Sequence, residues 1–203
     1  MTMADKPPSS PLKPSNEWHS RNYLPHWEAG ETPQAITFRL ADSLPADFRA
    51  RFQAELLSLP EEVQSREHKL FMERTLDAGR GEAYLSRPDV GKIVEDALLF
   101  FDGERYRLHA WCVMPNHVHV LATPLSENSL SALVHSWKSF TARKINVALG
   151  RQGQIWFPEY YDRKMRSEDH FEVVRYYIEQ NPVKAGLCKS AGEWRFSSAS
   201  LVR

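Results

Sequence analysis

Three segments of the chain carry the pattern of β-strands. Residues 35–40 alternate apolar and polar side chains and include β-branched residues. Residues 106–114 and 117–123 are mostly apolar and of strand length, and Pro115-Asn116 between them is a turn signal. The pattern predicts one early strand and two later strands that are neighbours.

Segments with helical spacing of apolar residues lie between and after these strands. Helices are expected at about 46–57, 60–78, 88–102, 129–149 and 167–180. Ser129 is the predicted cap of the fourth helix, and Asn181-Pro182 is expected to close the last. Residues 151–166 are expected to be a loop. Because strands and helices follow no strict repeat, the sequence predicts an α+β fold in which helices back an antiparallel sheet.

The length of 203 residues fits one domain with a ragged start. The first 16 residues are rich in Pro, Ser and Lys and have little to bury. Residues 1–20 are therefore predicted to be a disordered tail. Residues 21–203 are expected to form a single domain, with its core at about 33–187 and a C-terminal extension.

Composition narrows the class of protein. Hydrophobic residues make up 42% and charged residues 26%, which is ordinary for a soluble globular protein. No apolar run approaches the ~18–20 residues that span a membrane, and the start lacks the features of a signal peptide. Cys112 and Cys188 form no disulfide framework. We therefore expect a cytoplasmic protein with reduced cysteines.

Charge is balanced overall, with 26 basic and 26 acidic side chains, but it is unevenly distributed. Residues 41–105 carry 14 acidic against 9 basic side chains, whereas residues 106–203 carry 13 basic against 8 acidic. The stretch 131–166 has 7 basic against 2 acidic. A polyanion-binding face on the C-terminal half is one interpretation, and an ordinary solvated surface is the other.

His117 and His119 lie two residues apart on a predicted strand. Alternate side chains of a strand share a face, so both imidazoles point the same way while Val118 and Val120 point into the opposite layer. Paired imidazoles pack poorly in a core, because each needs hydrogen-bond partners, but they are good metal ligands. The pair alone leaves a metal site and a chance pairing both open.

Tyr177 and Asn181 form a second candidate pair. Four residues apart on a predicted helix, they lie on one face about a turn from each other. Tyr176 points elsewhere and is expected to fill a core position. A tyrosine in an amphipathic helix is ordinarily a packing or surface residue, so its spacing alone assigns Tyr177 no chemistry.

The sequence resembles the single-tyrosine transposases of the HUH superfamily, and more closely the REP-associated tyrosine transposases. The resemblance runs from about residue 21 to 201, and PNHVHVL followed by YIEQNPVKAGL is its most specific part. The blocks, in order, are RNYLPHW, ITFRLADSLP, YRLHAWCVMPNHVHVL, WKSFTARKIN, IWFPEYYDRKMRSEDHF, YYIEQNPVKAGL and EWRFSSAS. The segment holding 46–78 is longer than in compact insertion-sequence transposases, which is familiar in the REP-associated branch.

This resemblance implies roles for four residues. His117 and His119 match the two histidines of the HUH motif, and Tyr177 matches the catalytic tyrosine. Asn181 matches the third metal-facing position, which is a glutamine in some related transposases. The family's fold is ferredoxin-like, with the histidines on a central strand of an antiparallel sheet. The implied DNA is a short palindromic hairpin, the REP element.

The chemistry expected of such a site is DNA nicking and joining. A phenol with a pKa near ~10 is a weak nucleophile at neutral pH. A divalent ion held by the histidines and Asn181 would polarise the phosphate, with Mg²⁺ or Mn²⁺ active and Mn²⁺ bound more tightly. Attack by Tyr177 would leave a 5′-phosphotyrosine and a free 3′-hydroxyl, so rejoining needs no ATP.

Contacts to single-stranded DNA are expected from basic residues of the C-terminal half, while Trp137 is expected in the core. The candidates are Lys138, Arg143, Lys144, Arg163, Lys164 and Arg166. The protein is expected to be a monomer or a homodimer. The sequence leaves open whether Tyr177 meets the histidines of its own chain.

Three alternatives remain open at this stage. The first is a hairpin-binding regulator that keeps the site but does not cut. The second is a structural zinc protein that uses the histidines with Cys112 or Cys188, although no second cysteine completes a usual spacing. The third is a metallonuclease that uses water as the nucleophile.

Overall fold

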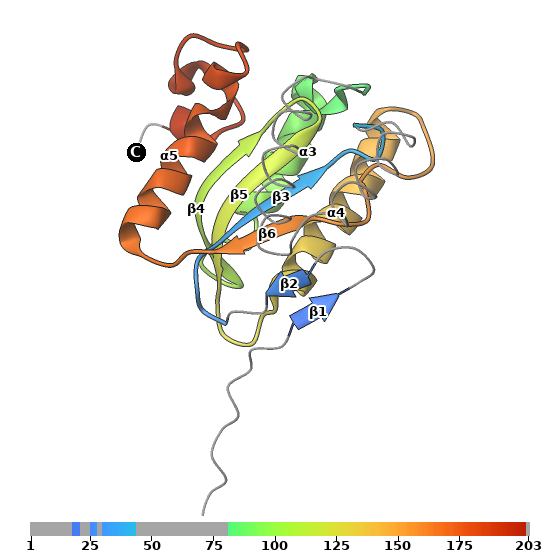
Figure 1. Cartoon of the computed structure of the whole chain (residues 1–203). Helices are drawn as coiled ribbons and strands as arrows, with labels where there is room; N and C mark the ends of the chain where they lie inside the picture. Colours follow the sequence, from blue (N-terminus) through green and yellow to red (C-terminus); the bar gives the residue numbers. More distant parts are fainter. Residues whose placement is uncertain (1–17, 21–24, 28–29, 44–80, 202–203) are drawn as a thin grey trace, which may run out of the picture.

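The structure, a computed structural model, describes residues 18–20, 25–27, 30–43 and 81–201. Its centre is an antiparallel sheet with strand order β4-β5-β3-β6 (Figure 1). The strands are β3 (Gln34–Arg39), β4 (Tyr106–Val113), β5 (His117–Pro124) and β6 (Tyr161–Lys164). A separate hairpin pairs β1 (Trp18–Ser20) with β2 (Pro25–Trp27).

Helices cover both faces of this sheet. Helices α3 (Pro88–Leu99) and α4 (Leu130–Ala148) pack on one face, and α5 (Glu168–Lys184) packs on the other, against β4 and β5 (Figure 1). Three short 3₁₀ turns complete the described part, at Tyr84–Ser86, Ala191–Glu193 and Ser198–Ser200. The arrangement is the α+β layering that the sequence predicts.

The larger core lies between the sheet and the α3–α4 layer. Val118 and Val120 of β5 point into it, as their alternation with the histidines predicts. Trp137 of α4 is 3% exposed, which confirms its expected place in the core. Its indole N–H donates to the Tyr106 hydroxyl at 3.1 Å, and that hydroxyl donates to the Leu98 carbonyl at 2.6 Å. These bonds satisfy the polar atoms that the two aromatic rings bring into the core.

The smaller core lies between the sheet and α5. It contains Cys112 from β4, Leu121 from β5, and Val174 and Ile178 from the helix. Tyr177 packs against its edge. This second core fixes the distance between α5 and the face of β5 that carries the histidines.

Most predicted elements are confirmed at nearly their predicted bounds. The strands at 35–40, 106–114 and 117–123 correspond to β3, β4 and β5, and β5 is central. Ser129 caps α4, because its hydroxyl accepts the Ala132 backbone N–H at 3.2 Å. The expected tail up to residue 16 and the helices at 46–57 and 60–78 lie outside the described residues.

Three local predictions are wrong. The expected loop at 151–166 contains β6, an edge strand of four residues too short for the alternation pattern to reveal it. Strand β1 likewise lies within the last three residues of the expected tail, 1–20. Helix α5 does not close at Asn181-Pro182 but continues to Lys184. Proline at position 182 removes one backbone hydrogen bond, the one to the Ile178 carbonyl, and the helix continues for two more residues.

Tyr176 also differs from its prediction, because it is 64% exposed and fills no core position. Its neighbour Tyr177 turns towards the sheet instead. Within the described part of the chain, no helix combines the length and the apolar character needed to cross a membrane.

Candidate active site

Strand β5 presents His117 and His119 on the face of the sheet that α5 covers. Both are buried, at 1% and 5% exposed. Their ring centroids lie 4.7 Å apart, and the two Nε2 atoms face each other at 3.0 Å. The strand alternation thus brings two nitrogen donors together at one point.

The outer nitrogens of both rings are held by side chains of the same sheet region. The Asn116 Oδ1 atom lies 2.7 Å from His117 Nδ1, and because a carbonyl oxygen can only accept, Nδ1 carries the proton. The Thr37 hydroxyl lies 2.9 Å from His119 Nδ1 and can donate or accept. These contacts leave the Nε2 lone pair of His117 directed inward and allow the same tautomer in His119.

Burial also sets the charge of the pair. Removal from water, followed by the nearby charge of a protonated His119, lowers the pKa of His117 well below its usual value. His117 is therefore neutral at physiological pH. A neutral imidazole with a free Nε2 is the form that binds metal ions.

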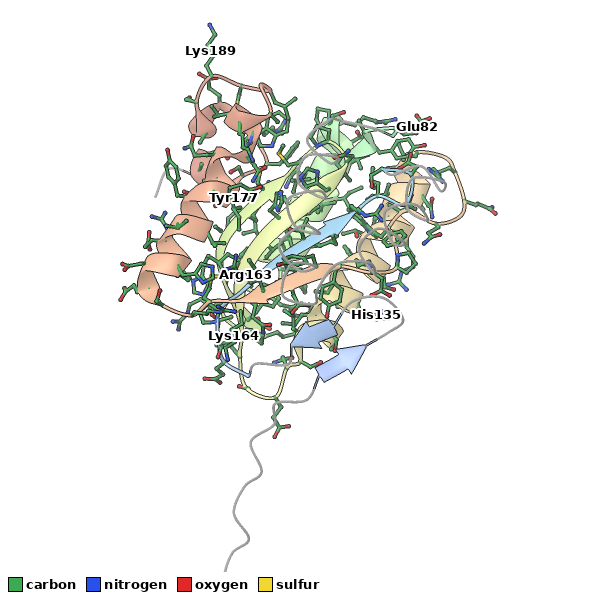
Figure 2. All side chains as sticks on the ribbon, in the orientation of Figure 1. Glu82, His135, Arg163, Lys164, Tyr177 and Lys189 are labelled. Carbon is green, nitrogen blue, oxygen red and sulfur yellow. The ribbon has the colours of Figure 1, made fainter. Side chains whose placement is uncertain are left out.

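Helix α5 brings Tyr177 and Asn181 to the same place. The Tyr177 ring centroid lies 6.0 Å from that of His119, at an interplanar angle of 77°, and Tyr177 projects from the sheet-facing side of the helix (Figure 2). Asn181, 1% exposed, donates from Nδ2 to the Tyr177 carbonyl at 3.1 Å, as the four-residue spacing predicts. Among the described residues, its Oδ1 atom has no hydrogen-bond partner.

These donors fit a divalent cation. In an octahedral site, neighbouring ligand atoms lie about 2.1 Å from the ion, and the two bonds form a right angle at the ion. Such ligand atoms are about 3.0 Å from each other. The 3.0 Å between the histidine Nε2 atoms matches that spacing. A buried, unpaired amide oxygen such as Asn181 Oδ1 is costly unless it gains a partner, and a cation would supply one.

The structural zinc alternative gains no support from the described residues. Within residues 18–20, 25–27, 30–43 and 81–201, no three His, Cys, Asp or Glu side chains gather as a metal would require. Burial raises the pKa of the Cys112 thiol, which disfavours the thiolate that binds zinc. Cys188 lies on the chain after α5 and is also free.

The candidate DNA contacts fall into two groups. Arg163 is the register partner of Ala35, on the sheet face of the histidines, whereas Lys164 pairs with Gln34 on the opposite face. Arg143 and Lys144 are exposed on α4, behind the sheet, and Arg166 is exposed after β6. Of the basic residues on α4 and β6, only Arg163 shares the histidine face.

Lys138 has a different environment from the other basic candidates. Its ammonium donates to the carbonyls of Phe157 and Pro158 at 2.7 and 2.6 Å. Burial lowers its pKa to about 8. The side chain thereby ties α4 to the segment that leads into β6, and its contact with DNA stays a prediction.

Sequence reasoning missed three residues around the histidines. Thr37 lies 82 positions from His119, so only the β3–β5 register brings them together. Asn116 was recognised only as a turn residue, although it directly precedes His117. Arg39, the register partner of His117, is 5% exposed and stacks its guanidinium 3.7 Å from the Phe157 ring centroid.

Comparison with known proteins supports a single family for the segment that carries this site. Residues 92–181 match the family described as transposase IS200-like. The matched segment contains both histidines, Tyr177 and Asn181. The match spans just under half of the chain, and the chain is therefore similar to this family over the segment that carries the candidate site.

Two further similarities are to REP-associated tyrosine transposases. The chain is 29% identical over 94 residues to a REP-associated tyrosine transposase of Escherichia coli strain K12, which covers 46% of this chain and 54% of that protein. The fold is also similar to the structure of a REP-associated tyrosine transposase bound to a REP hairpin. That similarity has a TM-score of 0.51 at 18% identity, over 90% of this chain and 82% of the other. The second likeness establishes the shared fold.

Proposed function

We propose that the chain is a REP-associated type of transposase that nicks and rejoins single-stranded hairpin DNA through Tyr177. The observation that carries this proposal is the approach of Tyr177 on α5 to the buried histidine pair on β5, with 6.0 Å between the rings of Tyr177 and His119. A tyrosine beside two inward-facing imidazole nitrogens is an arrangement suited to phosphoryl transfer. This arrangement combines residues of β5 and α5, two elements that are far apart in the sequence.

Tyr177 is the proposed nucleophile. Its phenolic oxygen would bond to the scissile phosphorus while the bond from phosphorus to the 3′ oxygen breaks. The products are a 5′-phosphotyrosine and a free 3′-hydroxyl. Because the energy of the phosphodiester is kept in the covalent link, a 3′-hydroxyl can reverse the step without ATP.

His117, His119 and Asn181 would hold a divalent cation, Mg²⁺ or Mn²⁺. The ion would supply positive charge for the non-bridging oxygens of the phosphate. The two imidazole ligands favour Mn²⁺, which accepts nitrogen ligands better than Mg²⁺ does. Asn116 and Thr37 would keep the imidazoles turned to the ion.

The proposed substrate is a REP-like hairpin with a single-stranded flank. Support comes from the names of the two relatives, of which one is bound to a REP hairpin. Arg163 on the histidine face is the basic candidate best placed to meet the backbone near the cut, while Arg143, Lys144 and Arg166 would serve more distant phosphates. The protein would act in the cytoplasm, at the nucleoid, as a monomer or homodimer.

A covalent-adduct assay tests this proposal. Single-stranded hairpins from the DNA flanking its own gene, labelled on the 3′ side of the cut, are incubated with the protein and Mn²⁺. Wild type is expected to give a labelled protein band on a denaturing gel. Tyr177→Phe should give none, because the nucleophilic oxygen is absent. Tyr176→Phe is the matched control, since that neighbouring ring is 64% exposed, and it should react like wild type.

The alternatives predict different results in this assay. A hairpin-binding regulator would shift the hairpin on a native gel and give no adduct. A water-using metallonuclease would cut the DNA without a protein-linked product, and Tyr177→Phe would cut as well as wild type. Either result rejects Tyr177 as the nucleophile.

A further inference from the structure

Tyr177, the proposed nucleophile, lies near the C-terminal end of α5. This end of a helix disfavours the binding of an anion such as phosphate. Tyr177 and Asn181 occupy the last two turns of α5, which ends at Lys184. The C-terminal end of a helix carries partial negative charge from its unpaired carbonyls. That charge, which falls off within the last turn, disfavours a phosphate that reaches from Tyr177 towards Lys184. A compensating cation is therefore expected close by.

Lys184 meets this requirement. It is the basic residue in the last turn of α5, and its ammonium lies 5.0 Å from the centroid of the Tyr177 ring. The distance is within the range in which a cation is attracted to an aromatic face. No role was assigned to Lys184 from the sequence, where α5 was expected to close at Asn181-Pro182.

The spacing of the helix explains how this contact arises. Residues 177, 181 and 184 follow each other at intervals of four and three, so they form one stripe along α5. Side chains on a helix lean towards its N-terminus, which directs the long Lys184 side chain back over Tyr177. Asn181 is buried on this stripe, whereas Lys184 is exposed and can be reached by DNA.

We propose that Lys184 is a catalytic residue that contacts the scissile phosphate beside Tyr177 and neutralises the charge that develops there. This inference rests on the proposed function. In the reaction, the Tyr177 oxygen bonds to phosphorus and the bond to the 3′ oxygen breaks. The phenolic proton passes to water, and the 3′ oxygen takes a proton from water. Lys184 stays protonated throughout and supplies charge that does not depend on the metal.

The test compares rates of adduct formation in Lys184→Met, Lys184→Arg and wild type, with saturating hairpin and Mn²⁺. Methionine keeps the length of the stem and loses the charge. We expect Lys184→Met to react about 10²- to 10³-fold more slowly, as when one charge-stabilising group is removed from an active site. Lys184→Arg should recover most of the rate, because arginine keeps the charge.

Lys189→Met is the matched control, because Lys189 extends away from the molecule in the turn after α5 (Figure 2). It should react at the wild-type rate. The urea midpoint and Mn²⁺ affinity are measured for each variant, and both should match wild type in Lys184→Met. Hairpin affinity should fall by less than the rate does, because the charge acts mainly in the transition state.

Failure of this inference is distinguishable from failure of the proposed function. If wild type forms no adduct, the proposed function is wrong. If wild type forms the adduct and Lys184→Met matches Lys189→Met in rate, Lys184 is not catalytic. If Lys184→Arg reacts as slowly as Lys184→Met, the shape of the side chain rather than its charge is required. That result would also overturn the inference.

Discussion

Asn116 and Thr37 act on the candidate metal site through their hydrogen bonds to His117 and His119. Asn116 Oδ1 fixes the proton of His117 on Nδ1, and the Thr37 hydroxyl holds His119 on the adjacent strand. The Asn116 contact directs the Nε2 lone pair of His117 to the point where the two rings meet, and the Thr37 contact allows the same tautomer in His119. Hydrogen bonds to the outer ring nitrogens set both the orientation and the basicity of histidine ligands.

Asn116→Ala should weaken Mn²⁺ binding about 10- to 100-fold, because the His117 ring loses the contact that fixes its proton and orientation. The affinity is measured by the electron paramagnetic resonance signal of free Mn²⁺ during titration. Asn128→Ala is a suitable control, since that side chain bonds the Leu125 carbonyl in the turn before α4. Unchanged Mn²⁺ affinity in Asn116→Ala would contradict the assigned role.

At the residue scale, the sequence predicted what lies on one element and missed what depends on two. The shared face of His117 and His119 follows from strand alternation, and the Tyr177–Asn181 contact follows from helical spacing. Thr37 is different, because its contact depends on the register between β3 and β5. Register is set by the packing of the whole sheet and cannot be read from one segment.

At the element scale, the C-terminal segment packs closely against α3 and is hydrogen-bonded to the end of β4. Phe196 lies over Gly91 of α3, and its backbone carbonyl accepts the Val113 N–H at 2.9 Å. A Cβ atom at position 91 would lie 2.6 Å from the Phe196 ring and 2.9 Å from the Leu85 carbonyl oxygen. The close approach of helix and chain therefore requires glycine.

Gly91→Ala should destabilise the protein, although alanine within a helix is normally better than glycine by ~1 kcal/mol. Overpacking costs about 1–3 kcal/mol, and the clash with the Leu85 backbone cannot be relieved by a side-chain rotation. Urea unfolding gives the free-energy change. Gly192→Ala is the control, because its nearest atom would be 3.7 Å away. Greater stability in Gly91→Ala would show that the close approach is absent.

Two elements that the sequence predicts wrongly, β6 and the end of α5, have different physical causes. Strand β6 has four residues and three charges, so it lacks an apolar pattern, and it forms because β3 offers an open edge. The end of α5 lies beyond the predicted one because the last turn accommodates Pro182, which is ordinarily a signal for the end of a helix. The long elements with clear periodicity, α4 and β5, were predicted almost to the residue.

At the scale of the whole molecule, the buried histidine pair links stability to pH. Burial lowers the pKa of His117 in the folded state, so below about pH 6.5 the unfolded chain binds a proton there that the folded chain does not. Stability contributed by this residue is therefore present at neutral pH and lost as pH falls. The loss is about 1.4 kcal/mol for each pH unit below the unfolded pKa.

His117→Gln removes this linkage because glutamine does not titrate. In the presence of a chelator, the unfolding free energy of wild type should fall more steeply from pH 7 to pH 5 than that of His117→Gln. The two curves are obtained by urea unfolding at each pH. Parallel curves would mean that His117 accepts its proton in the folded protein as easily as in the unfolded chain.

The central claim is that Tyr177 is the residue joined to DNA, and mapping of the covalent link tests it most directly. Trypsin cuts after Arg175 and Lys184, so one peptide of sequence YYIEQNPVK carries both Tyr176 and Tyr177. After reaction with the hairpin and Mn²⁺ and nuclease trimming, tandem mass spectrometry should find the 5′-phosphonucleotide on Tyr177. A modification on Tyr176 or on another residue, or an unmodified peptide from protein that has cut its DNA, would contradict the claim.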